Sequence, residues 1–447
     1  MSEKMSRREM LTETPIPQLI VKLSIPTIIS MLVTALYNSA DTYFVGKIST
    51  EATAAVGLVF SVMAVIQSLG FFCGHGSGNY LSRMLGADKK KEANEMAATG
   101  FAVALILGTI LAIVGNIFVH QIAGWLGATS GDTLQETENY MRIILIGAPF
   151  MMGQFVINNQ LRFQGNAVYA MGGLMCGAVI NIFLDPLLIL VLGWGVTGAA
   201  VATVAGQITS FTVLFIGSRR GENIKIQFKN IHINGFYLLE LANGGAPSLL
   251  RQGLAAISTL LLNRFAGQYG GDAAIAGMSI VSRVFLMMLS ALIGFGQGYQ
   301  PVVSFNYGAG ILKRVREGFF FCVKWGFIFL FAIASLCFIF APHIVGWFRD
   351  DAAVIEVGTL ALRCQAVVLP LSAPIVITNM MLQSMGKGVK ASILASARNG
   401  LCFIPLILIL PMFLGLLGVQ ITQTCADIIT TVMSVPMAYS ELKKMKE

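Results

Sequence analysis

Charged residues are scarce in this chain of 447 residues: they make up 12% of it, whereas 55% of the residues are hydrophobic. The mean hydropathy is +0.75. Soluble domains carry about 25% charged residues, and this chain has no polar stretch long enough to form a separate soluble domain. The N-terminal stretch MSEKMSRREMLTETP also lacks the apolar core of a cleavable signal peptide. The composition therefore favours an integral membrane protein.

The sequence also lacks the motifs of several enzymes and pumps. Its seven cysteines form no CxxC pair, so we expect neither a disulfide framework nor a zinc site. HExxH is absent, and so is the phosphate-binding GxxxxGK(S/T) of ATP-driven pumps. Ser77 lies in HGSG, which does not match the GxSG of a membrane serine protease. We therefore expect no enzyme and no cofactor, whereas composition alone leaves a channel open.

Long apolar runs fill the chain and predict twelve membrane helices, because about 20 mainly apolar residues suffice to cross a bilayer. The first six runs cover residues 20–45, 54–82, 95–119, 139–163, 170–192 and 196–218. After the basic connector SRRGENIKIQFKN, the second six cover 237–265, 274–305, 319–341, 355–384, 391–412 and 416–438. We thus expect an all-α integral membrane protein.

Basic residues alternate between the predicted loops. They gather in the N-terminus, in the loops after the second, sixth, eighth and tenth helices, and in the C-terminus. The opposite loops hold few bases, of which Lys47 and Arg349 are the clearest, and several acids. Positive loops stay in the cytoplasm. We therefore expect a multi-pass protein of the plasma (cell inner) membrane with both termini in the cytoplasm.

Glycine and proline patterns repeat along the chain. GHGSG at 74–78 and GFGQG at 294–298 both read GxGxG, at an offset of 220. Pro26 and Pro247 differ by 221, as do Asn158 and Asn379. We expect two six-helix bundles in parallel orientation around a central cleft, where secondary transporters bind their ligands. The predicted bundles are residues 1–220 and 237–447, joined by a cytoplasmic linker at 221–236.

A few polar residues interrupt the apolar runs of the N-terminal half. Asp41, within YNSADTYFVG, is the only charged residue between positions 23 and 45. Asp185 lies in NIFLDPLLI, with Asn181 one helical turn before it, and Thr203 lies in the next helix. A charge at membrane depth costs roughly 3 kcal/mol. We therefore expect these side chains to face a cavity or each other, at similar height in the membrane.

The chemistry of these four residues predicts a cation-coupling site. Their oxygen atoms suit a hard cation such as Na⁺. Alternatively, the two carboxyl groups carry protons, because burial and a neighbouring like charge both favour the protonated form. The other interpretation is a hydrogen-bonded network that only holds helices together, at about 0.6 kcal/mol per bond. The coupling ion is thus H⁺ or Na⁺.

Other polar residues are candidates for a substrate cavity. Tyr37 and Asn38 lie beside the first acid, and Gln207 lies one turn after Thr203. Asp427 is the repeat counterpart of Gln207 at an offset of 220, and is either a second-half candidate or part of a local pair. Pro26 would kink the first helix.

The twelve spans, the Pro–YNSAD–xxxVG order, the two GxGxG patterns and NIFLDP resemble the MATE family of multidrug and toxic compound extruders. The resemblance covers essentially the whole chain, and is greatest to the bacterial branch with MepA-type and DinF-type exporters. It implies multidrug efflux by antiport, as in antibiotic resistance: an amphiphilic, often cationic compound leaves as H⁺ or Na⁺ enters.

The resemblance also implies roles for particular residues. The family's coupling site matches Asp41, Asn181, Asp185 and Thr203, its neighbouring cavity matches Tyr37 and Asn158, and its kinking proline matches Pro26. The NorM-like branch uses acids in the seventh and tenth helices. Here those segments read PSLLRQGLAAISTLLLN and PLSAPIVITNMMLQSMG, without acids. Whether the C-terminal half has its own cation site stays open.

A flippase for lipid-linked sugars, from the same broader superfamily, is the nearest alternative. Such a protein needs cationic groups in its cleft to hold pyrophosphate. The outer halves of helices 20–45, 170–192 and 196–218 carry acids and no bases, which favours a cationic solute. We expect small amphiphilic substrates and the lipid bilayer as partners, no nucleic acid, and a monomer.

Overall fold

The chain folds into helices throughout the part that the structure, a computed structural model, describes: residues 6–45, 48–128 and 131–445, without the side chains of residues 35–44 and of Thr50. The N-terminal half contains α1 (Arg7–Glu13), α2 (Ile16–Val45), α3 (Thr50–Gly86), α4 (Lys90–Ile117), α5 (Val119–Trp125), α6 (Gly131–Phe163), α7 (Ala167–Pro186), the π-helix η1 (Leu187–Val191), α8 (Gly195–Ser218) and the short η2 (Phe228–Asn230). The C-terminal half contains α9 (Gly235–Gly308), α10 (Leu312–Phe348), α11 (Ala352–Val368), η3 (Leu369–Leu371), α12 (Ser372–Ser384), α13 (Gly388–Ser396), the π-helix η4 (Ala397–Leu401), α14 (Phe403–Leu414) and α15 (Leu416–Lys444).

Eleven helical segments of the described part are long and apolar enough to cross a membrane. One of them, α9, has 74 residues, far more than the roughly 30 Å of a bilayer core requires. Its backbone breaks at Gly271, where φ is 63° and ψ is −158°. A Cβ at Gly267 would lie 2.9 Å from the side chain of Ile275, so the chain folds back on itself there. α9 therefore holds two spans, and the predicted all-α membrane fold of twelve helices is confirmed.

Two compact units make up the chain. One contains Met1–Glu13 and Ile29–Gly245, and the other contains Thr14–Ile28 and Ala246–Glu447. Two long helices, α2 and α9, therefore contribute to both units. The expected halves, 1–220 and 237–447, remain a division of the sequence. The compact units differ from them because residues 14–28 belong to the second unit, whereas the linker and the start of α9 belong to the first.

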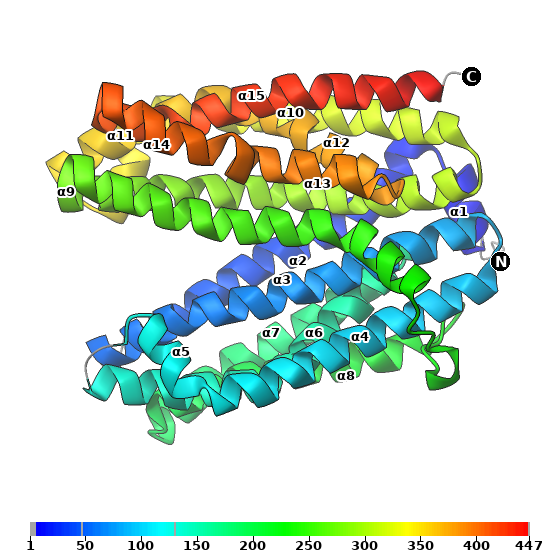
Figure 1. Cartoon of the computed structure of the whole chain (residues 1–447), viewed down its shortest axis with the longest axis horizontal. Coiled ribbons are helices and arrows are strands. Elements are labelled where there is room, and N and C mark those ends of the chain that lie inside the picture. Colours follow the sequence, from blue (N-terminus) through cyan, green and yellow to red (C-terminus); the bar gives the residue numbers. More distant parts are fainter. Residues whose placement is uncertain (1–5, 46–47, 129–130, 446–447) are drawn as a thin grey trace. The chain divides into compact units, whose positions relative to one another are not determined.

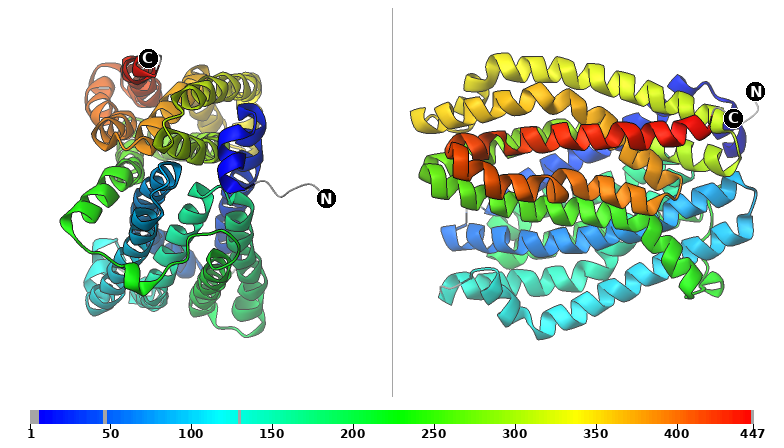
Figure 2. Two further views of the ribbon diagram at one scale, coloured as in Figure 1. Left: turned by 90° about the vertical axis from the view of Figure 1, so that its right-hand side faces the viewer. Right: turned by 45° about the horizontal axis from the view of Figure 1, so that its top comes forward.

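Within the first unit, α3 packs along α6, α7 packs along α8, and α4 lies against both α3 and α6. Figures 1 and 2 show these helices, coloured blue to green, running side by side. Small residues let α7 and α8 approach closely, since a Cβ at Gly206 would lie 2.8 Å from the carbonyl oxygen of Gly177. This contact fixes the relative height of the side chains on the two helices.

Within the second unit, α10 packs against α11 and α12, and α15 packs against α11, α12 and α14. The first part of α2 belongs to this unit and touches the second GxGxG. A Cβ at Gly294 would lie 2.7 Å from Cα of Ile28, and the hydroxyl of Thr27 donates to the carbonyl oxygen of Gly294 at 2.6 Å. The first GxGxG lies in α3, where a Cβ at Gly74 would meet Asn159 of α6 at 2.7 Å. The interpretation of both patterns as close helix packing is confirmed.

The repeat extends to individual hydrogen bonds. Nδ2 of Asn158 donates to the carbonyl oxygen of Ala170 at 2.8 Å, and Nδ2 of Asn379 donates to that of Ala391 at 2.7 Å. The helix ends that follow these asparagines also match, with φ of 81° at Gly165 and 76° at Gly386. Glycine suits both positions because it adopts positive φ without strain. The offset of 221 thus reflects the same local structure built twice.

The close approach of α7 and α8 gives a testable prediction. Gly177→Ala places a methyl group against Gly206 and Ser210, and overpacking of this kind costs about 1–3 kcal/mol. We expect a lower apparent melting temperature of the purified protein in detergent. Gly172→Ala, in the same helix, is the control, because a Cβ there meets nothing within 4 Å. Equal melting temperatures for the two variants would contradict the packing argument.

Candidate functional site

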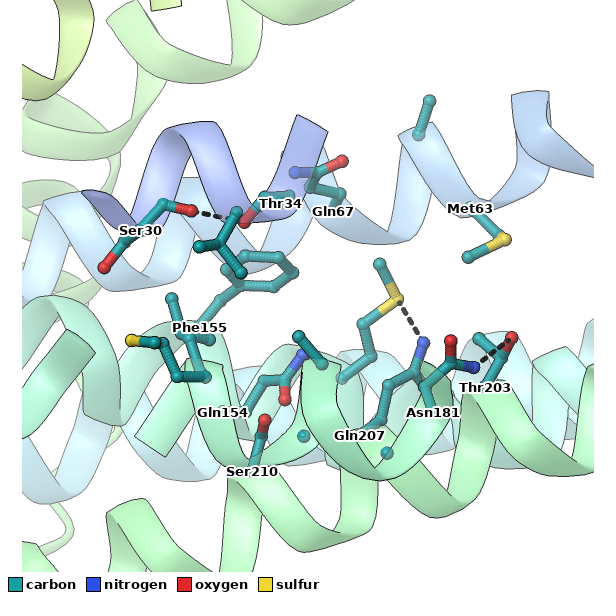
Figure 3. A pocket seen from close by; sticks show the side chains of 18 of the residues that line it. Ser30, Thr34, Met63, Gln67, Gln154, Phe155, Asn181, Thr203, Gln207 and Ser210 are labelled. Atoms are coloured by element: carbon teal, nitrogen blue, oxygen red, sulfur yellow. Dashed lines mark hydrogen bonds between the residues drawn. The ribbon is translucent and has the colours of Figure 1, made fainter. Parts of the chain in front are cut away.

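A pocket of about 100 Å³ opens within the first unit, between α2, α3, α6, α7 and α8. Its walls are largely apolar, with methionine and phenylalanine side chains among them. Its polar lining is made of hydroxyl and amide groups (Figure 3): Ser30, Thr34, Gln67, Gln154, Asn181, Thr203, Gln207 and Ser210. No charged side chain lines it among the residues that the structure describes. The pocket therefore offers an apolar surface with neutral hydrogen-bonding groups.

Three of the predicted coupling residues meet at the edge of this pocket. Asp185 is completely buried and Asn181 is 1% exposed. Nδ2 of Asn181 lies 3.4 Å from Oδ1 of Asp185 and 3.4 Å from Oγ1 of Thr203, and Figure 3 marks the contact with Thr203. Rotating the amide improves the fit, because Nδ2 then donates to Oδ2 of Asp185 at 3.0 Å and the amide oxygen accepts from the Thr203 backbone at 3.2 Å. In both orientations the amide of Asn181 joins the carboxylate to α8.

The local sequence explains this arrangement. Asn181 and Asp185 are four residues apart in α7 and therefore lie on one face of it. The contact between Gly177 and Gly206 brings that face against α8 at Thr203. Pro186 ends α7 and the π-helix η1 follows, a backbone irregularity that is frequent at functional sites. Asn181 and Thr203 line the pocket, whereas Asp185 contacts Asn181 and is not itself a lining residue.

The side chains of Tyr37, Asn38 and Asp41 lie outside the described residues, so their contacts stay predictions. The backbone around them is part of α2. Ser30 and Thr34 of the same helix line the pocket, and the hydroxyl of Thr34 donates to the carbonyl oxygen of Ser30 at 2.8 Å. Positions 30, 34, 37 and 41 share one helical face by their spacing.

The structure places the remaining sequence candidates as follows. Gln207 lines the pocket, and its Nε2 donates to Sδ of Met151 at 3.5 Å. Asn158 is not brought to the pocket lining, and its amide binds the backbone of α7 instead. Pro26 lies inside α2, two residues before the point where α2 passes from one unit to the other.

Gln154 is a lining residue that sequence reasoning missed. It is 7% exposed and lies in α6, within MMGQFVINNQ. An amide inside an apolar run is itself a signal, because an unsatisfied polar group is costly in a membrane. The run contains four such amides, however, and nothing in their spacing tells which of them faces the pocket.

Asp427 forms a local pair in the second unit. It is completely buried, and its Oδ1 accepts from Nε of Arg398 at 2.8 Å while its Oδ2 accepts from the same guanidinium at 3.2 Å. Nε2 of Gln423 adds a bond to Oδ1 at 2.9 Å. The sequence left two alternatives open for Asp427, and the structure shows the local pair, with Arg398 as its partner. The guanidinium neutralises the carboxylate that stands at the repeat position of Gln207.

Twelve membrane helices in two compact units, with a buried carboxylate at the edge of a small, partly apolar pocket, define a multi-pass transporter-like membrane protein. Comparison with known sequences gives the family. The chain belongs to the MatE family, whose sequence model matches residues 26–187 and again 247–409. The double match agrees with the internal repeat.

Relatives and solved structures agree with this assignment. The chain is 28% identical over 433 residues to the multidrug export protein MepA of Staphylococcus aureus (strain NCTC 8325 / PS 47), covering 96% of this chain and 94% of that protein. It resembles the outward-facing conformation of a multidrug resistance MATE family transporter of the MOP superfamily, with a TM-score of 0.92, 28% identity and coverage of 99% and 100%. A MOP superfamily transporter from Pyrococcus furiosus is similar at a TM-score of 0.92, with 27% identity and 99% coverage of both chains.

The ion pair of the second unit gives a prediction. Arg398→Met or Asp427→Leu alone leaves a buried polar or charged group without its partner, which costs roughly 3–5 kcal/mol. We expect each single variant to have a clearly lower melting temperature than the wild type, and the double variant to recover most of the loss. Thermal unfolding of the purified proteins measures this. A double variant no more stable than the singles would contradict a self-contained pair.

Proposed function

We propose that this protein is a secondary active antiporter that exports small amphiphilic, often cationic compounds in exchange for H⁺ or Na⁺. The observation that carries the proposal is the buried carboxylate of Asp185, joined through Asn181 to the lining of the pocket. A cation or proton that reaches Asp185 therefore acts next to the place where a solute would bind. The names of the relatives, which describe multidrug export, support the same conclusion.

The proposed coupling site consists of Asp41, Asn181, Asp185 and Thr203. In the described geometry the amide nitrogen of Asn181 faces Asp185, which stabilises the ionised carboxylate. Protonation of Asp185 would weaken that bond and loosen the link between α7 and α8. Binding of Na⁺ would instead require the Asn181 oxygen to turn toward the carboxylate, because Na⁺ binds oxygen atoms. Either ion suits these residues, but the two ions would require different orientations of the Asn181 amide.

The pocket is the proposed substrate cavity, with Gln207 in its lining and Tyr37, Asn38 and Asn158 as further candidates from the sequence. Its neutral, partly apolar lining suits an amphiphilic solute. The described lining has no basic side chain that would hold a pyrophosphate, which counts against a lipid-linked sugar flippase. We propose no catalytic step and no cofactor for this protein.

The proposed cycle is alternating access by the two six-helix halves, residues 1–220 and 237–447, in a monomer. Both termini and the linker 221–236 are proposed to be cytoplasmic, because they carry basic residues and positively charged loops stay in the cytoplasm. An entering proton or cation displaces the substrate outward. One charge crossing 100 mV releases roughly 2.3 kcal/mol, and one pH unit adds about 1.4 kcal/mol, enough to export a solute uphill.

Transport in proteoliposomes tests the proposal. Ethidium movement is followed under an imposed pH gradient and then under an imposed Na⁺ gradient. We expect one gradient to drive uphill movement by the wild type. Asp41→Asn and Asp185→Asn should abolish that coupling while dye binding persists, because each removes a titratable carboxylate. Asp132→Asn, at an exposed acid in the first turn of α6, is the matched control and should transport normally.

Two results would overturn parts of the proposal. Gradient-driven transport that survives in both acid variants would assign Asp41 and Asp185 a structural role only. A wild type that moves no dye under either gradient would argue against antiport, and lipid-linked sugars would then be the next substrates to test.

A further inference from the structure

Two buried amide oxygens line the pocket without a hydrogen-bond donor. Gln154 of α6 and Gln207 of α8 are each 7% exposed. Oε1 of neither residue accepts a hydrogen bond from any part of the chain that the structure describes. Buried carbonyl groups are nearly always paired in folded proteins, because an unpaired acceptor away from water is unfavourable. Two such oxygens in one pocket are acceptor positions that the donors of a ligand can fill.

Two neighbours, Met151 and Gly147, lie beside the side-chain amide of Gln207. Its Nε2 is directed to Sδ of Met151 at 3.5 Å. Its Oε1 lies 3.1 Å from the position that a Cβ of Gly147 would occupy, so the absence of a side chain at Gly147 leaves room for this oxygen. A thioether is only a weak acceptor. The amide of Gln207 therefore has no strong hydrogen-bond partner among the described residues. Figure 3 shows this contact and the position of Gln154 in the same pocket.

The rest of the lining restricts what the donor can be. Met63, Met151 and Phe155 form apolar walls, and no basic side chain lines the described pocket. An amide oxygen accepts a hydrogen bond from an N–H group of an amine or ammonium ion. A quaternary ammonium ion carries the same charge but no N–H, so it would fill the pocket and leave both oxygens unpaired. Sites that hydrogen-bond a ligand group discriminate strongly against an analogue without it.

We propose that Gln154 and Gln207 select substrates that carry N–H donors, so that primary and secondary amines with an apolar body are preferred over quaternary ammonium compounds. This inference rests on the proposed function, which it deepens by naming the substrate class. Gln154 and Gln207 are then specificity residues, and they act through neutral acceptor oxygens rather than through charge.

A matched pair of fluorescent ligands tests the inference. The ligands are 1-naphthylmethylammonium and its N,N,N-trimethyl analogue, and the dissociation constant of each is measured with the purified full chain in detergent. The two ligands differ in hydration, but this difference is the same for every protein variant. The ratio of their dissociation constants, compared between variants, therefore isolates the contribution of the glutamines.

We expect Gln154→Met and Gln207→Met each to reduce the preference for the primary amine by about tenfold, the effect of losing one hydrogen bond to a charged group. Binding of the trimethyl compound should persist in both variants, which also reports that they are folded. Gln121→Met is the matched control: Gln121 is exposed on α5 and does not line the pocket, so the ratio should stay at the wild-type value.

The outcomes separate the two proposals. An unchanged ratio in both glutamine variants, with both ligands still bound, would refute the selection of N–H donors and leave the antiporter proposal intact. Failure of the wild type to bind either ligand, together with no gradient-driven transport of either in proteoliposomes, would refute the proposed function, and the inference with it.

Discussion

The lack of water in a bilayer is the constraint on which the rest of this structure depends. A polar side chain within the membrane must find its partner in the protein or lie beside a cavity. Asp427 does the former, since it accepts bonds from two nitrogens of the Arg398 guanidinium, and Asn158 does so by donating to a backbone carbonyl. Gln154 and Gln207 do the latter, since both line the pocket with an oxygen that accepts no bond from the described residues. The paired groups join helices to one another, whereas the oxygens of Gln154 and Gln207 remain available to a ligand in the pocket.

Close helix contact provides the framework for these pairs. Glycine lets α7 and α8 approach until their backbones touch, and this sets Asn181 opposite Thr203. The same device joins α2 to α9 at the second GxGxG. Helices in lipid gain little from burying apolar surface against each other, so small residues and van der Waals contact take over that role. The buried carboxylate of Asp185 thus depends on glycines that make no polar contact with it.

Much of the fold follows from the sequence, because apolar length, basic loops and a constant offset are properties of the chain itself. The shared face of Asn181 and Asp185 was also predictable from their four-residue spacing, and Thr203 of the next helix was expected at a similar height in the membrane. Other features depend on tertiary packing that leaves no local pattern. Gln154 looks like its neighbouring amides, and Arg398 lies 29 residues from Asp427 on a different helix. Asn158 donates to the backbone of α7, and its repeat counterpart Asn379 makes the same kind of bond to Ala391, a role that the residue type does not reveal.

The passage of α2 from one compact unit to the other has a consequence for biosynthesis. Residues 14–28 belong with helices made much later, and Thr27 bonds to a carbonyl group 267 residues further along the chain. At about 5–20 residues per second, a ribosome needs roughly 13 to 50 s to make that partner. During this interval the hydroxyl of Thr27 has only its own helix to bond, through the carbonyl oxygens of Leu23 and Ser24. The hydroxyl of Thr27 in the first membrane helix therefore bonds within its own helix until the eighth membrane helix has been made and supplies the carbonyl group of Gly294.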